Sequence, residues 1–112
     1  MRETGRDGFM SKVQKRLKEE FPDCIVLRND PSSNVQGVPD LTVLNGDRWA
    51  SLEVKRSATA SHRPNQDFYV DKMNRDSYAA FIYPENEERI FSELQSALQP
   101  RRQACVLKRK SA

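Results

Sequence analysis

The spacing of apolar residues near the start of the chain predicts a helix followed by a short strand. Apolar side chains recur every three or four positions between residues 10 and 21, which places them on one face of a helix that Pro22 ends. Residues 24–27 form a short apolar run typical of a strand. The polar stretch 29–37, with one proline and one glycine, predicts a loop.

The middle of the chain predicts a β-hairpin. Residues 38–44 and 49–55 both alternate between apolar and polar positions, and the connection between them contains Asn45-Gly46, a strong turn signal. Alternating residues of a strand face opposite sides of the sheet. We therefore expect one apolar face (Leu41, Val43, Ala50, Leu52 and Val54) and one polar face (Asp40, Thr42, Ser51, Glu53 and Lys55).

The second half adds one strand and two helices. A polar linker at 57–64 precedes a helix at 65–75, in which Tyr69 and Met73 share a face. The aromatic and apolar stretch 78–83 predicts a strand, and an acidic turn after Pro84 leads into an apolar helical pattern that Pro100 closes. The expected order is αβββαβα, an α/β domain over residues 1–98 followed by a basic tail at 99–112.

Composition limits the classes of protein. A chain of 112 residues with 37% hydrophobic content supports one domain with a modest core. No apolar run approaches the roughly 20 residues that span a bilayer, so we expect a soluble cytoplasmic protein without a membrane partner. Cys24 and Cys105 lack the spacing of a zinc site and are expected to be reduced thiols, and no motif indicates an organic cofactor.

The net charge of +3 hides a basic tail. The body before position 101 carries 14 basic and 16 acidic residues, so the positive charge is concentrated at the end of the chain. Such a tail is typical of binding to a polyanion such as nucleic acid, although it also serves to increase solubility. Its basic residues are Arg101, Arg102, Lys108, Arg109 and Lys110.

The hairpin brings two acids near each other. With a four-residue loop between the strands, Leu44 pairs with Trp49 and Asp40 falls opposite Glu53, whereas a two-residue turn shifts the pairing by one diagonal. Cross-strand Cβ atoms lie about 5 Å apart, which lets two carboxylates share one Mg²⁺ ion. The pattern therefore predicts a metal site for phosphodiester chemistry.

Lys55 lies two residues after Glu53 and shares its face of the strand. A divalent cation lowers the pKa of a coordinated water, and an ammonium group helps offset charge on a phosphate. The alternative is that Glu53 and Lys55 are ordinary cross-strand surface charges, and a second Pro-Asp pair, Pro22-Asp23, shows how easily half of the motif arises.

Pro39-Asp40 followed by Glu53-Val54-Lys55, within an αβββαβ order, resembles the PD-(D/E)XK nuclease superfamily. The surrounding Gly37-Val38-Pro39-Asp40-Leu41 and Arg63-Pro64-Asn65-Gln66 are most similar to VRR-Nuc domains and phage Holliday-junction-resolvase-like nucleases. The resemblance implies a restriction-endonuclease-like fold, with a mixed central sheet flanked by helices. It also implies a Mg²⁺ site, with Mn²⁺ as a substitute, made by Asp40, Glu53 and the Val54 carbonyl.

The same resemblance assigns roles to neighbouring residues. Lys55 positions or activates the water, and Gln66 orients the lysine or the substrate, unless Gln66 is simply a polar residue in a first helical turn. Many relatives carry a further acid on the first helix. Here only Glu20 and the preceding Glu3 are available, each of which is equally a solvated glutamate, so the number of metal ions stays open.

The expected function is a small metal-dependent DNA endonuclease, for which selectivity toward branched or junction DNA is one option. Arg56 and Arg63 on the rim, together with the tail, are candidate phosphate contacts. Cutting two strands would need two sites and therefore a homodimer. The alternative is a non-catalytic nucleic-acid-binding module with the same fold. A third alternative is an adaptor for an RNA or replication partner, and the resemblance suggests a phage origin.

Overall fold

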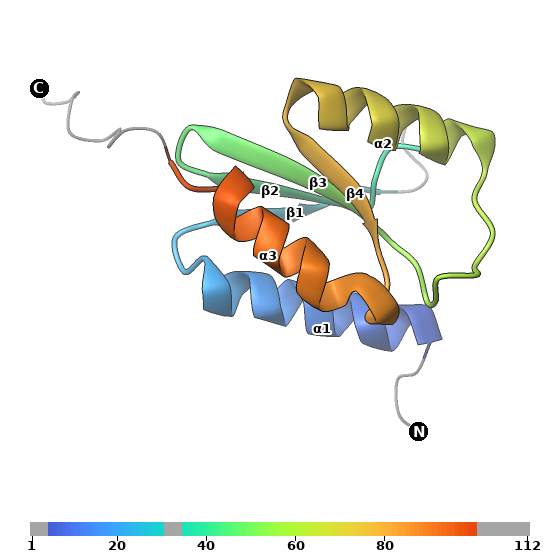
Figure 1. Cartoon of the computed structure of the whole chain (residues 1–112), viewed down its shortest axis with the longest axis horizontal. Helices are drawn as coiled ribbons and strands as arrows, with labels where there is room; N and C mark the ends of the chain where they lie inside the picture. The colour runs from blue at the N-terminus through green and yellow to red at the C-terminus, as the bar shows by residue number, and fades with distance from the viewer. Residues whose placement is uncertain (1–4, 31–34, 101–112) are drawn as a thin grey trace, which may run out of the picture.

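The computed structural model describes residues 5–30 and 35–100. Figure 1 shows three helices around one sheet: the first helix of the chain lies below the sheet, the last lies in front of it, and the middle one lies above it. The elements are α1 (Gly5–Glu20), β1 (Ile25–Arg28), β2 (Leu41–Asn45), β3 (Arg48–Val54), α2 (Pro64–Asp76), β4 (Tyr78–Ile82), the 3-10 turn η1 (Pro84–Asn86) and α3 (Glu87–Ala97).

The sheet is mixed, as the sequence predicts. Its strands lie in the order β1-β2-β3-β4, with antiparallel pairing from β1 to β3 and a parallel pairing between β3 and β4. Parallel neighbours need a crossover connection, which here contains α2. The order αβββαβα is therefore confirmed.

The β2–β3 hairpin has the predicted register with a shorter turn. Leu44 pairs with Trp49, but Asn45 and Arg48 form one further pair, so the turn contains only Gly46 and Asp47. The shorter turn therefore adds one residue pair, and the register that places Asp40 opposite Glu53 is unchanged. Gly46 has φ of +64°, the left-handed conformation that glycine adopts without a steric penalty.

Helices cover both faces of the sheet. α1 and α3 pack on one face, and α2 packs on the other over β3 and β4 (Figure 1). The apolar face expected for the hairpin is buried against α1 and α3. The core consists mainly of Phe9, Met10, Val13, Leu17, Phe21, Leu41, Val43, Ala50, Leu52, Val54, Ile82, Ile90, Phe91, Leu94 and Leu98.

Two element boundaries differ from the sequence prediction by three or more residues. α1 begins at Gly5 and not near residue 10, because its first turn carries charged residues that the apolar pattern does not reveal. β2 begins at Leu41 and not at 38, since Pro39 has no N–H group to donate to a neighbouring strand. In α2 the buried residue is Val70, while Tyr69 and Met73 are only half-buried.

Two further expectations concern membrane-spanning segments and the cysteine thiols. Within the described part of the chain, no helix is long and apolar enough to cross a membrane. Cys24 is a buried free thiol. Cys105 and the five basic tail residues lie outside the described residues, so the structure leaves their expected roles as predictions.

Candidate active site

Asp40 lies in the loop immediately before β2, and backbone contacts fix its position. The Asn29 side chain donates a hydrogen bond to the Pro39 carbonyl oxygen (2.7 Å), and the Asn29 backbone N–H donates to the Asp40 carbonyl oxygen (2.8 Å). The Asp40 Oδ2 atom accepts a hydrogen bond from the Val54 N–H (2.8 Å). The carboxylate of Asp40 is therefore held beside the end of β3.

Glu53 is the most buried acid of the hairpin, with 4% of its surface exposed. It lies on the face of β3 that α2 covers, and its Oε2 atom accepts a hydrogen bond from Gln66 Nε2 (3.0 Å). Burial, followed by the nearby charge of Asp40, raises the pKa of Glu53 to about 7, although Lys55 and Arg6 lower it. Two carboxylates in this position attract a cation or share a proton.

Lys55 and Gln66 connect this acid to the start of α2. Lys55 Nζ donates to Gln66 Oε1 (2.8 Å) and to the Ser61 carbonyl oxygen (3.0 Å), and it lies 3.9 Å from Glu53 Oε2. Gln66 Oε1 also accepts a hydrogen bond from the Arg63 N–H at the helix start (3.1 Å). The amide of Gln66 therefore bridges the lysine and the glutamate that the sequence places on one strand.

A close backbone contact joins the Gly37 loop to α2. Gly37 has φ of +92°, and a Cβ atom at this position would lie 2.3 Å from the Asn65 Cβ atom. Only glycine fits both the conformation and the space. The contact closes one side of a hollow of about 370 Å³, whose lining includes Asp40, Glu53 and Gln66.

Arg6 is a functional candidate that sequence reasoning missed. It lies in the first turn of α1, where Nη2 donates to Asp40 Oδ1 (2.6 Å) and Nε donates to the Val54 carbonyl oxygen (3.2 Å). Its only sequence signal is its charge, because the apolar pattern of the helix begins after it. Asn29, which positions Asp40, was likewise assigned only to a loop.

Comparison with known proteins bears on the fold. No family model matches the sequence, and no match among curated proteins was found. A solved structure described as a VRR_NUC domain protein matches with a TM-score of 0.62 and 14% sequence identity, over 89% of this chain and 94% of that chain. This chain has a VRR-Nuc-like fold. The resemblance inferred from Asp40, Glu53 and Lys55 is thereby confirmed at the level of the fold.

Within this VRR-Nuc-like fold, Glu20 is not part of the acidic pair. It lies in the last turn of α1, whereas Arg6 in the first turn contacts Asp40. Arg6 and Glu20 are 14 positions apart in the sequence, which corresponds to about 20 Å along the helix axis. Glu20 Oε2 instead accepts a hydrogen bond from Arg16 (2.6 Å), which also pairs with Glu87 and Glu88 of α3. The structure therefore places Glu20, the expected additional metal ligand, away from Asp40 and Glu53.

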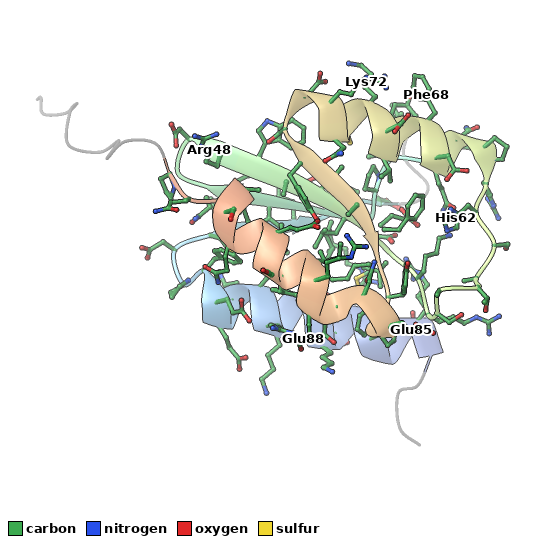
Figure 2. The ribbon with its side chains drawn as sticks, viewed as in Figure 1. Arg48, His62, Phe68, Lys72, Glu85 and Glu88 are labelled. Carbon is green, nitrogen blue, oxygen red and sulfur yellow. The ribbon has the colours of Figure 1, made fainter. Side chains whose placement is uncertain are left out.

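Of the basic residues predicted to contact DNA, Arg56 and Arg63 lie within the described part of the chain. Arg63 lines the hollow and Arg56 is exposed after β3. His62, the only histidine of the sequence, stacks on Phe81 with ring centroids 3.9 Å apart and pairs with Asp67 (3.0 Å). Figure 2 shows His62 on the loop that leads into α2. These contacts give His62 a role in packing this loop.

The donor atoms suit a hard cation. Among residues 5–30 and 35–100, no group of three or more His, Cys, Asp or Glu side chains is placed to hold a metal ion. Asp40 and Glu53 supply two carboxylates, and the Val54 carbonyl supplies a third oxygen, already engaged by the Arg6 guanidinium. Mg²⁺ binds through one or two carboxylates and keeps several waters, so this oxygen set fits it.

Proposed function

We propose that this chain is a Mg²⁺-dependent endonuclease that hydrolyses phosphodiester bonds in DNA. The observation that carries the proposal is that Asp40 and Glu53 line one hollow, with Lys55 Nζ 3.9 Å from Glu53 Oε2, in a VRR-Nuc-like fold. Two acids followed by a lysine provide the groups that metal-assisted phosphodiester hydrolysis requires.

Asp40, Glu53 and the Val54 carbonyl would hold the metal, with Mn²⁺ as a substitute for Mg²⁺. The bound cation would lower the pKa of a water and offset negative charge on the phosphate. The Val54 N–H orients Asp40 by binding Oδ2, which leaves Oδ1 directed away from the strand backbone. Ionisation of Glu53, whose pKa is about 7, supplies the second negative charge.

Lys55 and Gln66 act on the substrate side of these acids. The ammonium group of Lys55 is only slightly exposed and is fixed by Gln66 and the Ser61 carbonyl, so its charge is already in place before substrate arrives. A preorganised charge costs no rearrangement when negative charge develops on the phosphate. Gln66 touches both Lys55 and Glu53 and is a positioning residue.

DNA is the proposed substrate, and its backbone is the proposed point of contact. Arg56, Arg63 and the basic tail offer positive charge that does not depend on base sequence. A domain of this size has little surface for reading bases, which favours recognition of DNA shape, including branches and junctions. Cutting both strands would require two copies of the site, and hence a homodimer.

The test is cleavage of labelled linear, flapped and four-way-junction DNA with Mg²⁺, Mn²⁺ or EDTA. Wild type is compared with Asp40→Asn and with Asp23→Asn, which alters the other Pro-Asp pair in the chain. We expect cleavage that needs a divalent metal, disappears in Asp40→Asn and persists in Asp23→Asn. Light scattering with and without the best substrate reports whether the active species is a dimer.

Two results would contradict the proposal. Cleavage that survives Asp40→Asn would assign the activity to a contaminant or to another site. Binding of DNA by wild type without cleavage of any substrate, in either metal, would replace the enzyme with a non-catalytic binding module. Equal cleavage of linear and branched DNA would remove only the junction selectivity.

A further inference from the structure

One arginine holds two of the oxygen atoms that the proposed function gives to a metal. Arg6 contacts Asp40 Oδ1 through Nη2 (2.6 Å) and the Val54 carbonyl oxygen through Nε (3.2 Å). These acceptors come from the loop before β2 and from the last residue of β3. A single guanidinium therefore lies where two ligands of the expected cation converge.

This contact places Arg6 in competition with a cation for Asp40. Asp40 Oδ2 already accepts the Val54 N–H, so Oδ1 is the oxygen that remains for a cation. Arg6 takes that oxygen. A guanidinium and a divalent ion at the same carboxylate oxygen would repel each other strongly in a partly buried site. Binding of one therefore weakens binding of the other.

Arg6 is more exposed and less constrained than Lys55, so it can leave the site more easily. The Arg6 side chain is 40% exposed, and it also forms an ion pair with exposed Asp7 (3.7 Å). The Lys55 side chain is 11% exposed and is tied to Gln66 and the Ser61 carbonyl. Withdrawal of Arg6 opens no core, because the buried residues of α1 begin at Phe9.

We infer that Arg6 is an internal counter-ion of this site, which competes with the divalent cation for Asp40 and Val54 and is exchanged for it. The inference rests on the proposed function, because it presupposes that Asp40 is a metal ligand. The exchanged guanidinium remains beside the site on a long side chain. Its planar pair of donors matches a phosphate oxygen pair, so the exchange links metal binding to capture of the nucleic-acid backbone.

The direct test is binding of Mn²⁺ to the full chain without DNA, measured by electron paramagnetic resonance of the free ion. Wild type is compared with Arg6→Ala and Arg6→Gln, and with Lys15→Ala, which removes one exposed positive charge from the same helix. If Arg6 covers the site about nine-tenths of the time, its removal lowers the apparent dissociation constant about tenfold. Lys15→Ala should change this constant less than twofold.

Arg6→Gln keeps a neutral hydrogen-bonding side chain and guards against a folding defect in Arg6→Ala, which circular dichroism checks. Tighter Mn²⁺ binding by both variants, with the same number of ions bound, supports the inference. So does binding that appears only when Arg6 is replaced. Unchanged or weaker binding in folded Arg6 variants overturns it.

The failure of the inference can be separated from failure of the proposed function. If wild type cleaves DNA with Mg²⁺ while Arg6→Gln binds Mn²⁺ as wild type does, only the counter-ion role is lost. If neither wild type nor the Arg6 variants bind Mn²⁺ and no DNA is cleaved, both are overturned. DNA affinity with divalent metal bound gives a second readout, and it should fall in Arg6→Gln if the released guanidinium also captures phosphate.

Discussion

Gln66 Oε1 accepts a hydrogen bond from Lys55 Nζ over 2.8 Å, while the amide nitrogen of the same side chain donates to Glu53. One residue at the start of α2 therefore sets the orientation of two groups at the end of β3. Because Gln66 Oε1 also receives the Arg63 N–H, the geometry of the helix start is transmitted to the lysine.

Replacing Gln66 by alanine should slow DNA cleavage about 10- to 100-fold, the usual effect of removing a residue that orients a reactive group. DNA affinity should change little, since Gln66 is a positioning residue. Single-turnover rates at saturating DNA measure this. Lys72→Gln is the control, because Lys72 lies on the outer surface of α2 and points away from the sheet (Figure 2). Equal slowing in both variants would contradict the positioning role.

The raised pKa of Glu53 predicts a pH-dependent stability in the presence of EDTA. Its pKa is about 7 in the folded chain against an ordinary value of 4.5, so the folded state binds the proton more tightly. Folding stability should therefore fall as pH rises from about 4.5 to 7, by about 3 kcal/mol from this group. Urea unfolding at pH 5 and 8 measures the fall.

Glu53→Gln should remove this contribution, and Asp40→Asn should reduce it because the neighbouring charge helps to raise the Glu53 pKa. The stability difference between wild type and Glu53→Gln would then widen as pH rises. A difference that stays constant between pH 5 and 8 would show that Glu53 titrates normally.

Gly37→Ala should disrupt the site by displacing the start of α2, which contacts the Gly37 loop. The substitution places a Cβ atom 2.3 Å from the Asn65 Cβ atom and forces a left-handed backbone on a residue with a side chain. We expect a loss of at least about 2 kcal/mol in unfolding free energy. Cleavage should fall further than stability explains, because the start of α2 must move. Gly5→Ala is the comparison: it shares a positive φ but has open space around the added atom.

Ser51 offers a stabilising substitution. Its side chain is fully buried on the α2 face of β3, and its Oγ atom has no hydrogen-bond partner among the described residues. Ser51→Ala removes an unsatisfied hydroxyl, so the unfolding free energy should rise by about 1 kcal/mol. Ser77→Ala should do the opposite, because Ser77 Oγ donates to the Trp49 carbonyl oxygen. A loss of stability in both variants would indicate a partner for Ser51.

The hairpin could be predicted from sequence because its information is local. Alternation in both strands and the Asn45-Gly46 turn signal determine which residues pair, and the pairing determines that Asp40 and Glu53 approach each other. Lys55 lies two residues after Glu53, so its side chain is on the same side of the strand. These three positions required no knowledge of distant contacts.

The partners of the acids could not be predicted in this way. Arg6 reaches Asp40 from 34 residues away, and nothing in its neighbourhood distinguishes it from other basic residues of α1. Its contact depends on how α1 lies across the sheet, which is decided by core packing. Glu20 shows the same limit, because the sequence does not reveal that the last turn of α1 lies away from Asp40 and packs beside α3.

The two-residue turn at Gly46 and Asp47 has a consequence for the order of folding. A hairpin closed by a short turn forms within microseconds, whereas contacts between distant segments form later. Asp40 and Glu53 should thus meet while Arg6 and Gln66 are still elsewhere, and their mutual repulsion opposes the first steps of assembly. Protons and divalent cations in the medium would reduce this repulsion and would therefore accelerate refolding.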